Sequence, residues 1–447
     1  MAPPLICQSS RIPRPSIPHT DRRSLHRPAL SLSVPLCRTP RRLRSSVSRP
    51  FGFSSSGRKI GVADTISEMS EDNDSERVAF WKKNFLGDTY RGLDAAAEEE
   101  DPSHPQDFTK EGLDAKEVVL CLSKSIVSLV SSVDGKPLFG CTGTVVNHVG
   151  SETWILTSAT LVRKPGTDHD AYKADEVKIE VLLDNKRSIN GRLAMCNLQY
   201  NIAVVTIELQ FGLPIVALND PPEYYSILGR PVVAVGRDSK SQVLLVRHGN
   251  MIRKRSKLDC SELLLCTCPV SKTFIGGLVM DFERRIIGIS FFGEDTTPVM
   301  PIEIVSRCLK HFKKFRTLKL PCLCIRGHAV HSLELRSLEI LCLNFPELSC
   351  GIGIVVDQIS GESPENFGGI EAGDIICSID GVVLHSLAQL TAMLLDKFFA
   401  MKSEKTMVLQ AVMRRPRDNS KFVAMLNIWE NSSVECSNSF SNRWPLL

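Results

Sequence analysis

The chain has 447 residues, of which 43% are hydrophobic and 23% are charged, and its formal net charge at pH 7 is +4. These shares are typical of a soluble globular protein of two or three domains, and so small a charge gives no argument for a nucleic-acid partner. No uncharged apolar run reaches the roughly 18 residues of a membrane-spanning helix, and the nearest run, 118–133, contains Lys124.

The 15 cysteines are odd in number and show no regular framework. The C-x-C pairs Cys266/Cys268 and Cys322/Cys324 lack the C-x-x-C spacing and the nearby histidine of a structural zinc site. We therefore expect buried, reduced thiols in a reducing compartment, and no metal or other cofactor.

Residues 1–63 are rich in Arg, Ser and Pro, and Asp21 is their one acidic residue. Such a composition cannot bury a core and matches an organelle transit peptide. The density of proline works against a long amphipathic helix, which favours a chloroplast over a mitochondrion. The alternative is a disordered basic tail with a nuclear signal at 38–49, which places the protein in the nucleus or cytoplasm.

Residues 64–116 reverse the charge, with acidic runs at 68–76 and 98–101. A short helix is expected within 76–95, where aromatic residues share a face. We interpret the segment as an acidic linker and assign it no site, because a run of charge is usually solvated.

From 117 to 316 the sequence predicts many short strands, separated by turn signals such as Asp134-Gly135. Short strands with little helical periodicity between them indicate antiparallel barrels or a sandwich, and the length suits two barrels joined near 210–214. A helix is expected at 300–315. The predicted strands are 126–133, 143–149, 154–158, 177–184, 191–195, 203–208, 231–236, 243–251, 263–266 and 286–292.

From 320 to 430 the pattern changes to mixed α/β. The expected elements are strands 351–359 and 375–379, a helix at 386–398, and a hairpin of strands 406–413 and 421–428. Residues 431–447 are expected to form a loose polar tail.

Several motifs, in their order along the chain, resemble the Do-like (HtrA) serine proteases, in which a trypsin-like domain precedes a PDZ domain. The resemblance covers about residues 117–430 and implies a mostly β protein: a trypsin-like double antiparallel β-barrel over 117–316 followed by an α/β PDZ domain over 320–430. The motifs are CTGTVV from Cys141, WILTSATLV from Trp154, YNIAVV from Tyr200, FIGGLV from Phe274, and the stretch from Ser363 to Gly381 that contains GDIICSIDG.

The resemblance assigns the family's catalytic His, Asp and Ser to Thr160, Asn201 and Ile275. A threonine has no nitrogen base, an asparagine has no charge to hold an imidazolium, and an isoleucine has no nucleophile. The family's oxyanion-hole glycine corresponds to Thr273, whose β-branched side chain resists unusual backbone angles. The chain is therefore identified as a degenerate, plant-type pseudo-protease member of the family, with no catalytic residues.

A rearranged site is the alternative. Ser271 or Thr273 would then be the nucleophile, and the base would be His148, expected in a hairpin turn, or His169, in the loop 164–175. Neither spacing predicts a contact with Ser271, and the loss of one triad member already costs about 10⁴–10⁶ in rate.

In the family, a PDZ domain binds an extended C-terminal peptide by strand addition. The resemblance places the carboxylate loop at Leu323-Cys324-Ile325, although the family has glycine at its middle position. It places the other wall of the groove on helix 386–398, with Ala388 and Leu390, and His385 is interpreted as a cap of that helix. The alternative is a packing module without a ligand.

Three hypotheses for function follow. The first is a catalytically inactive Do-like protease homologue that binds C-terminal or unfolded peptides, alone, as a homo-oligomer, or as a hetero-oligomer with active relatives. The second is a weakly active or rearranged serine endopeptidase or chaperone in protein quality control. The third is the product of a degenerating gene copy with no selected role.

Overall fold

The computed structural model describes residues 110–165, 170–183, 187–208, 212–219, 227–258, 260–323, 325–348, 351–359, 368–401 and 406–430. The transit peptide predicted at 1–63, the helix expected within 76–95 and the tail 431–447 lie outside these residues. Within them, no helix is both long enough and apolar enough to cross a membrane.

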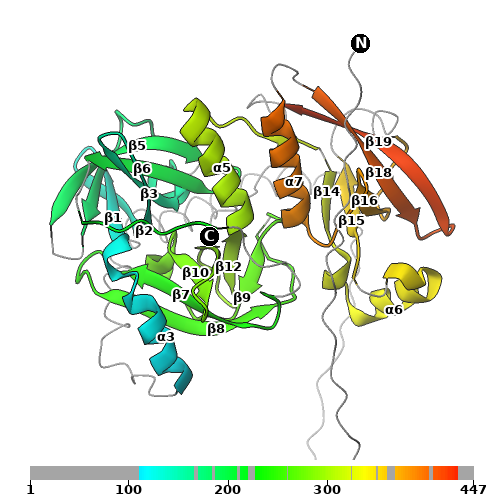
Figure 1. Cartoon of the computed structure of the whole chain (residues 1–447), viewed down its shortest axis with the longest axis horizontal. Coiled ribbons are helices and arrows are strands. Elements are labelled where there is room, and N and C mark those ends of the chain that lie inside the picture. The colour runs from blue at the N-terminus through cyan, green and yellow to red at the C-terminus, as the bar shows by residue number, and fades with distance from the viewer. Residues whose placement is uncertain are drawn as a thin grey trace, which may run out of the picture. The chain divides into compact units, whose positions relative to one another are not determined.

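Six antiparallel strands close the first barrel, in the order β1-β2-β3-β6-β5-β4 (Figure 1). Strands β3 and β6 are buried along almost their whole length, as expected from their β-branched and aromatic residues. Trp154 of β3 is 1% exposed and is among the largest side chains of the core. The strands are β1 Ile126–Val133, β2 Lys136–Val149, β3 Glu152–Ser158, β4 Lys178–Leu182, β5 Ser188–Asn197 and β6 Ile202–Glu208.

The second barrel is also closed by six antiparallel strands, in the order β10-β11-β12-β9-β8-β7. Helix α3 (Lys110–Leu120), near the start of the described chain, packs against β8. Helix α5 (Ile302–Phe315) follows the last strand. The strands are β7 Pro231–Arg237, β8 Leu244–Ile252, β9 Leu264–Cys266, β10 Leu278–Asp281, β11 Ile286–Ser290 and β12 Thr297–Pro301.

The buried side chain of Arg237 connects the second barrel to the beginning of the first. Its Nε donates to the carbonyl oxygen of Ile126 at 2.6 Å, and its Nη2 donates to that of Ser123 at 2.6 Å. The hydroxyl of Ser128 donates in turn to the carbonyl oxygen of Arg237 at 2.9 Å. A guanidinium that is 3% exposed is stable here because several carbonyl oxygens accept its hydrogen bonds.

A separate sheet forms the C-terminal domain, in the order β13-β19-β18-β16-β15-β14, with β17 paired to β16. Its own apolar core lies between the sheet and helix α7 (Leu387–Ala400), and helix α6 (Leu335–Asn344) follows β14. The strands are β13 Pro321–Cys322, β14 Ile325–Ala329, β15 Ile354–Ile359, β16 Ile375–Ile379, β17 Val382–Val383, β18 Thr406–Arg415 and β19 Ser420–Glu430.

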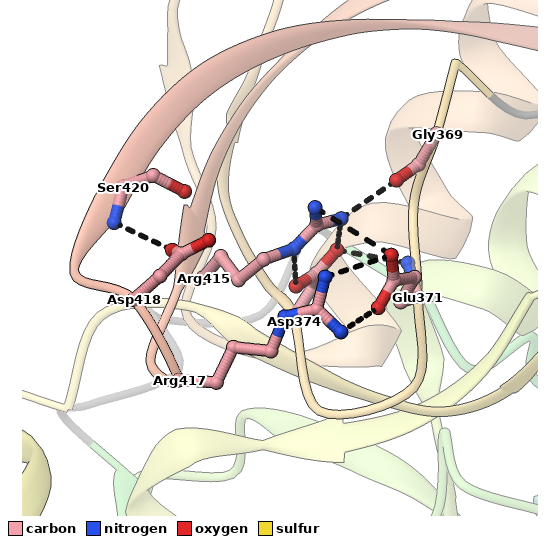
Figure 2. A network of polar contacts seen from close by, with 7 residues as sticks. All are labelled: Gly369, Glu371, Asp374, Arg415, Arg417, Asp418 and Ser420. Carbon is pink, nitrogen blue, oxygen red and sulfur yellow. Dashed lines mark hydrogen bonds and ion pairs between the residues drawn. The ribbon is translucent and has the colours of Figure 1, made fainter.

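A network of ion pairs fixes the hairpin β18–β19 to the loop that precedes β16, as Figure 2 shows. Arg415 forms a two-pronged pair with Asp374, with Nε 2.8 Å from Oδ1 and Nη2 2.7 Å from Oδ2, and Nη2 also donates to the carbonyl oxygen of Gly369. Asp374 is buried, and its Oδ2 accepts the backbone N–H of Glu371 at 2.8 Å. The carboxylate raises the pKa of Arg415 and keeps it charged.

Helix α7 also contacts helix α5 of the barrel domain. Arg307 Nη2 lies 2.8 Å from Asp396 Oδ2, and the ring of His311 stacks on that of Phe399 with centroids 3.9 Å apart. Leu395 of α7 is fully buried among the side chains of the barrel core. The face of α7 that points away from its own sheet is therefore covered.

The predicted double barrel is confirmed, with strand positions close to those expected. Two of its strands, β10 and β12, were not predicted, and neither were α3 and α6. The interpretation of His385 as a cap is wrong, because the N-cap is Ser386, whose Oγ accepts the N–H of Gln389 at 3.1 Å. The expectation of reduced thiols is wrong for Cys322, which is disulfide-bonded, whereas the other described cysteines are free.

Candidate functional site

A cluster of three polar side chains stands where the resemblance expects the His–Asp pair. The end of β3 and the short helix η3 (Ala159–Val162) position Ser158 and Thr160, and Asn201 lies just before β6. Ser158 Oγ donates to Asn201 Oδ1 at 3.0 Å, and Asn201 Nδ2 donates to Thr160 Oγ1 at 3.0 Å. Ser158 Oγ also accepts the backbone N–H of Thr160 at 3.1 Å.

The backbone of Asn201 is in the left-handed region, with φ +52°. Asparagine tolerates this region better than most residues. Its carbonyl oxygen accepts the backbone N–H of Ala159 at 3.2 Å. Asn201 is 3% exposed and Thr160 is half-buried, so that the cluster reaches solvent on the side of Thr160.

The third position, Ile275, lies at the end of the short helix η4 (Lys272–Phe274), between β9 and β10. Its side chain is 4% exposed and packs into the barrel core. Its backbone N–H donates to the carbonyl oxygen of Lys272 at 3.1 Å, and its own carbonyl oxygen accepts the N–H of Thr142 at 3.0 Å. An oxyanion hole needs this N–H to point at the substrate. Here it forms a hydrogen bond within the turn instead.

Gly276 brings this turn against the Ser158–Thr160–Asn201 cluster. Its φ is +80°, and a Cβ added there would lie 2.8 Å from the backbone nitrogen of Ser158 and 2.5 Å from the carbonyl oxygen of Thr142. Only glycine allows so close an approach of two backbones. The structure thus brings the turn that contains Ile275 and Gly276 close to Ser158, one member of the polar cluster.

The hydroxyl groups of the turn are buried. Thr273 is 2% exposed, and its carbonyl oxygen accepts the hydroxyl of Thr142 at 2.7 Å. Ser271 Oγ is shielded from solvent and has no hydrogen-bond partner in the described part of the chain. Burial also lowers the pKa of Lys272. A thiol nearby, Cys141, is no substitute nucleophile, because burial raises its pKa to about 12 against the opposing hydrogen bond with Thr157.

One of the two histidines weighed as bases, His148, does not enter this cluster. His148 lies on β2, not in a turn, and its Nδ1 and Nε2 lie 3.0 Å from Thr153 Oγ1 and from the carbonyl oxygen of Leu213. His169 lies outside the described residues. Ser158 was not singled out from the sequence, although its place two residues before Thr160 is the signal for a side-chain cap of a short turn.

The residues predicted to bind a peptide differ in exposure. Leu323 is 9% exposed and Ile325 is half-buried at the start of β14, whereas Cys324 lies outside the described residues. Ala388 and Leu390 are each 1% exposed: Leu390 faces the core of its own sheet, and Ala388 packs with the barrel core. Strand β14 is the last strand of the sheet. Peptide binding at these residues stays a prediction.

Within the described residues, no group of three or more His, Cys, Asp or Glu side chains is placed to hold a metal ion. The C-x-C pair on and after β9, Cys266 and Cys268, is buried in the second barrel, and the two thiols are hydrogen-bonded to each other. This arrangement offers two sulfur ligands, fewer than a structural zinc site needs.

Comparison with known proteins gives one family and several relatives. Residues 141–289 match the trypsin-like peptidase domain. The chain is 25% identical over 252 residues to protease Do-like 14 of Arabidopsis thaliana, covering 54% of this chain and 56% of the relative. It is 24% identical over 259 residues to serine protease HTRA3 of Homo sapiens, covering 55% and 54%. The chain thus spans just over half the length of these curated relatives.

Among solved structures, the crystal structure of a serine endoprotease from Yersinia pestis is similar, with a TM-score of 0.43 and 16% identity. The similarity covers 71% of this chain and 97% of that chain.

Proposed function

This chain belongs to the Do-like (HtrA) serine protease family, and we propose that it is a catalytically inactive member that acts as a peptide-binding or scaffold subunit. Its C-terminal sheet would be a PDZ domain that takes C-terminal or unfolded peptides, and its barrels would serve assembly with copies of itself or with active relatives.

The turn at Ile275 carries the proposal. Acyl transfer needs an oxygen or sulfur nucleophile, and the side chain here is a buried hydrocarbon. It also needs donors aimed at the developing oxyanion, each worth about 10²–10³ in rate, and the N–H of Ile275 is committed to Lys272. Among the described residues, no imidazole lies in the polar cluster around Thr160, whose partners are a hydroxyl and an amide.

The role as a peptide-binding subunit draws on a second feature. Strand β14 is the last strand of its sheet, and strand addition requires an unpaired strand edge of this kind. The barrel side of α7 is covered by α5, so a peptide would have to use the side of the domain on which β14 lies.

The test is chemical labelling combined with peptide capture. The full chain is incubated with a fluorophosphonate probe and, separately, with fluorescent casein, next to an active Do-like protease as a positive control. We expect neither labelling nor cleavage, and we expect immobilised chain to capture members of a peptide library with free C-termini. The same library with amidated C-termini is the matched control.

Stoichiometric labelling of Ser271, Ser158 or Thr160 would overturn the proposal and support a weakly active or rearranged endopeptidase. Equal capture of the amidated library would remove the PDZ assignment and leave a scaffold that binds unfolded chain. A chain that neither cleaves nor captures any peptide would contradict the peptide-binding role.

A further inference from the structure

The unpaired edge of β14 fixes the direction in which a bound peptide would run. A peptide added antiparallel to β14, with its carboxylate near Leu323, would pass along the strand toward Ala329. Each residue advances by about 3.3 Å, so the peptide's fifth residue from the C-terminus would come level with Ala329. Residues further upstream would pass the short helix η5 (Val330–Ser332).

A basic loop of the second barrel is attached to this strand. The loop 253–257 has the sequence RKRSK and follows β8, and its four cations are exposed. Asp357 of β15 holds the loop in place, because its Oδ2 lies 2.9 Å from Nη2 of Arg255. The other oxygen of Asp357 lies 2.8 Å from Nδ1 of His328 on β14, an ion pair when the ring is protonated. The loop is thereby connected to the edge strand through one carboxylate.

Arg255 and Lys257 of the basic loop form direct ion pairs, with Asp357 and Asp295. Arg253 and Lys254 form none within the described residues, although the charge of Lys254 also lowers the pKa of Asp295. Burial and the charge of Arg253 lower the pKa of His331, in η5, to about 4, with smaller contributions in the same direction from His385 and His328 and an opposing one from a backbone hydrogen bond. These groups come from the basic loop, from η5, from the start of α7 and from β14. Positive potential therefore converges where the upstream part of a peptide would leave the edge of β14.

We propose that this end of the β14 edge selects peptides that carry acidic residues about five to eight positions before their C-terminus. The inference rests on the proposed peptide-binding function and adds the class of ligand. Carboxylates there would meet Arg253 and Lys254, the two loop cations outside the direct ion pairs. The residues around Leu323 and Ile325 are apolar, so the last residues of the peptide would be selected by their shape and not by their charge.

Because the cations are exposed, the preference is modest and sensitive to salt. Pairs of hydrated charges are weak individually, and two to three of them give a preference of about tenfold at low ionic strength. At high salt the Debye length falls to about 3 Å at 1 M, so the preference should nearly vanish. A site made of buried charges would not respond to salt in this way.

Two peptide libraries test the inference on the full chain. Both are decapeptides with the last four positions randomised and free C-termini. In one library the four preceding positions are Glu-Asp-Glu-Glu, and in the other they are Gln-Asn-Gln-Gln. Capture by immobilised chain is measured at 50 mM and 500 mM salt. We expect about tenfold more capture of the acidic library at low salt and less than twofold more at high salt.

The variant Arg253→Gln with Lys254→Gln should reduce the acidic-to-neutral ratio at least threefold, and Lys313→Gln, which removes an exposed charge at the end of α5, should not change it. Equal capture of both libraries by the unaltered chain would overturn the inference while the peptide-binding function stands. Capture of neither library would overturn both. A preference that persists in the double variant would place the recognition elsewhere and also overturn the inference.

Discussion

Thr160 and Asn201 are joined by a hydrogen bond of 3.0 Å from the amide nitrogen of Asn201 to the hydroxyl oxygen of Thr160. The pair connects the short helix η3 to the start of β6. It is a contact between two uncharged groups, and it contributes to the stability of the barrel.

The first prediction separates the two roles of Asn201. Asn201→Gly keeps a residue suited to φ +52° but removes the side chain, which leaves Ser158 and Thr160 without this partner, and should lower the free energy of unfolding by about 1–2 kcal/mol. Asn201→Ala removes the same contacts and adds about 1 kcal/mol of backbone strain. Urea unfolding of both variants checks the order. Equal stability of the two variants would contradict the assigned backbone role.

The second prediction tests the proposed inactivity by introducing the family's triad residues. Thr160→His, Asn201→Asp and Ile275→Ser together should leave cleavage of casein at background, because the N–H of residue 275 stays bound to Lys272 in the η4 turn. A lost oxyanion donor alone costs about 10²–10³ in rate. Adding Thr273→Gly, which frees the backbone of the turn, should give the first measurable labelling by a fluorophosphonate. Activity of the triple variant at the rate of an active relative would refute this account of the turn.

The third prediction concerns pH. The pKa of His331 is lowered to about 4 in the folded chain, so between about pH 6.5 and pH 4 the unfolded state takes up a proton that the folded state does not. The free energy of unfolding should therefore decrease as the pH falls through this window, by about 2 kcal/mol from this residue after allowance for its partial exposure.

Urea unfolding at pH 7 and pH 4.5 measures this loss in the unaltered chain and in His331→Asn. The variant should lose less stability between the two pH values. Part of the pH dependence should remain, because burial also lowers the pKa of His311. Arg253→Gln should raise the pKa of His331, which a titration of its ring resonances by NMR would detect. An unchanged pH dependence in His331→Asn would rule out the assignment.

The fourth prediction tests the pair in Figure 2. Asp374→Ala leaves the guanidinium of Arg415 with only the more distant carboxylate of Glu371, 3.6 Å away, and should destabilise the C-terminal sheet by about 2–3 kcal/mol, a value reduced because Arg415 is partly open to water. Asp418→Ala, at an exposed carboxylate in the same hairpin, is the matched control and should have a much smaller effect. Similar decreases in the midpoint of thermal unfolding for the two variants would show that the ion pair contributes little to stability.

The fifth prediction concerns Leu395, which belongs to α7 but is buried in the barrel core. Leu395→Ala should cost about 2–5 kcal/mol and separate the unfolding of the barrels from that of the C-terminal sheet. Differential scanning calorimetry would then show two transitions. Leu343→Ala, at a side chain 75% exposed on α6, is the control. A single transition with an unchanged midpoint would mean that the contact with α5 does not couple the domains.

Most barrel strands could be predicted from the sequence because their own residues show the β-strand pattern. The β-branched run in β1 and the alternation in β8 have the same limits in the structure as in the prediction, within one residue. Strands β10 and β12 were missed for a physical reason: β10 has four residues directly after two glycines, and β12 contains two prolines, which count against a strand. Helix α6 was missed because its exposed leucines mask its periodicity.

The details of the candidate site could not be predicted from the sequence. Gly276 and Gly277 mark the turn, and the resemblance assigns the site to Thr160, Asn201 and Ile275; the structure shows a hydrogen bond between the first two and brings Gly276 close to Ser158. That the N–H of Ile275 is used by Lys272 depends on the η4 turn, a three-residue element with no sequence pattern of its own. The burial of Ala388 depends on α5, which is distant in sequence, so no local pattern could indicate it.

The hydrogen bonds of Arg237 to Ser123 and Ile126 span more than a hundred positions of the chain. During synthesis, these two carbonyl oxygens cannot accept their hydrogen bonds until Arg237 has emerged from the ribosome. Chains dominated by such distant pairings fold slowly. Chains that end before Arg237 should therefore lack the donor for these two carbonyl oxygens, and the start of the first barrel should be less stable in them than in the full chain.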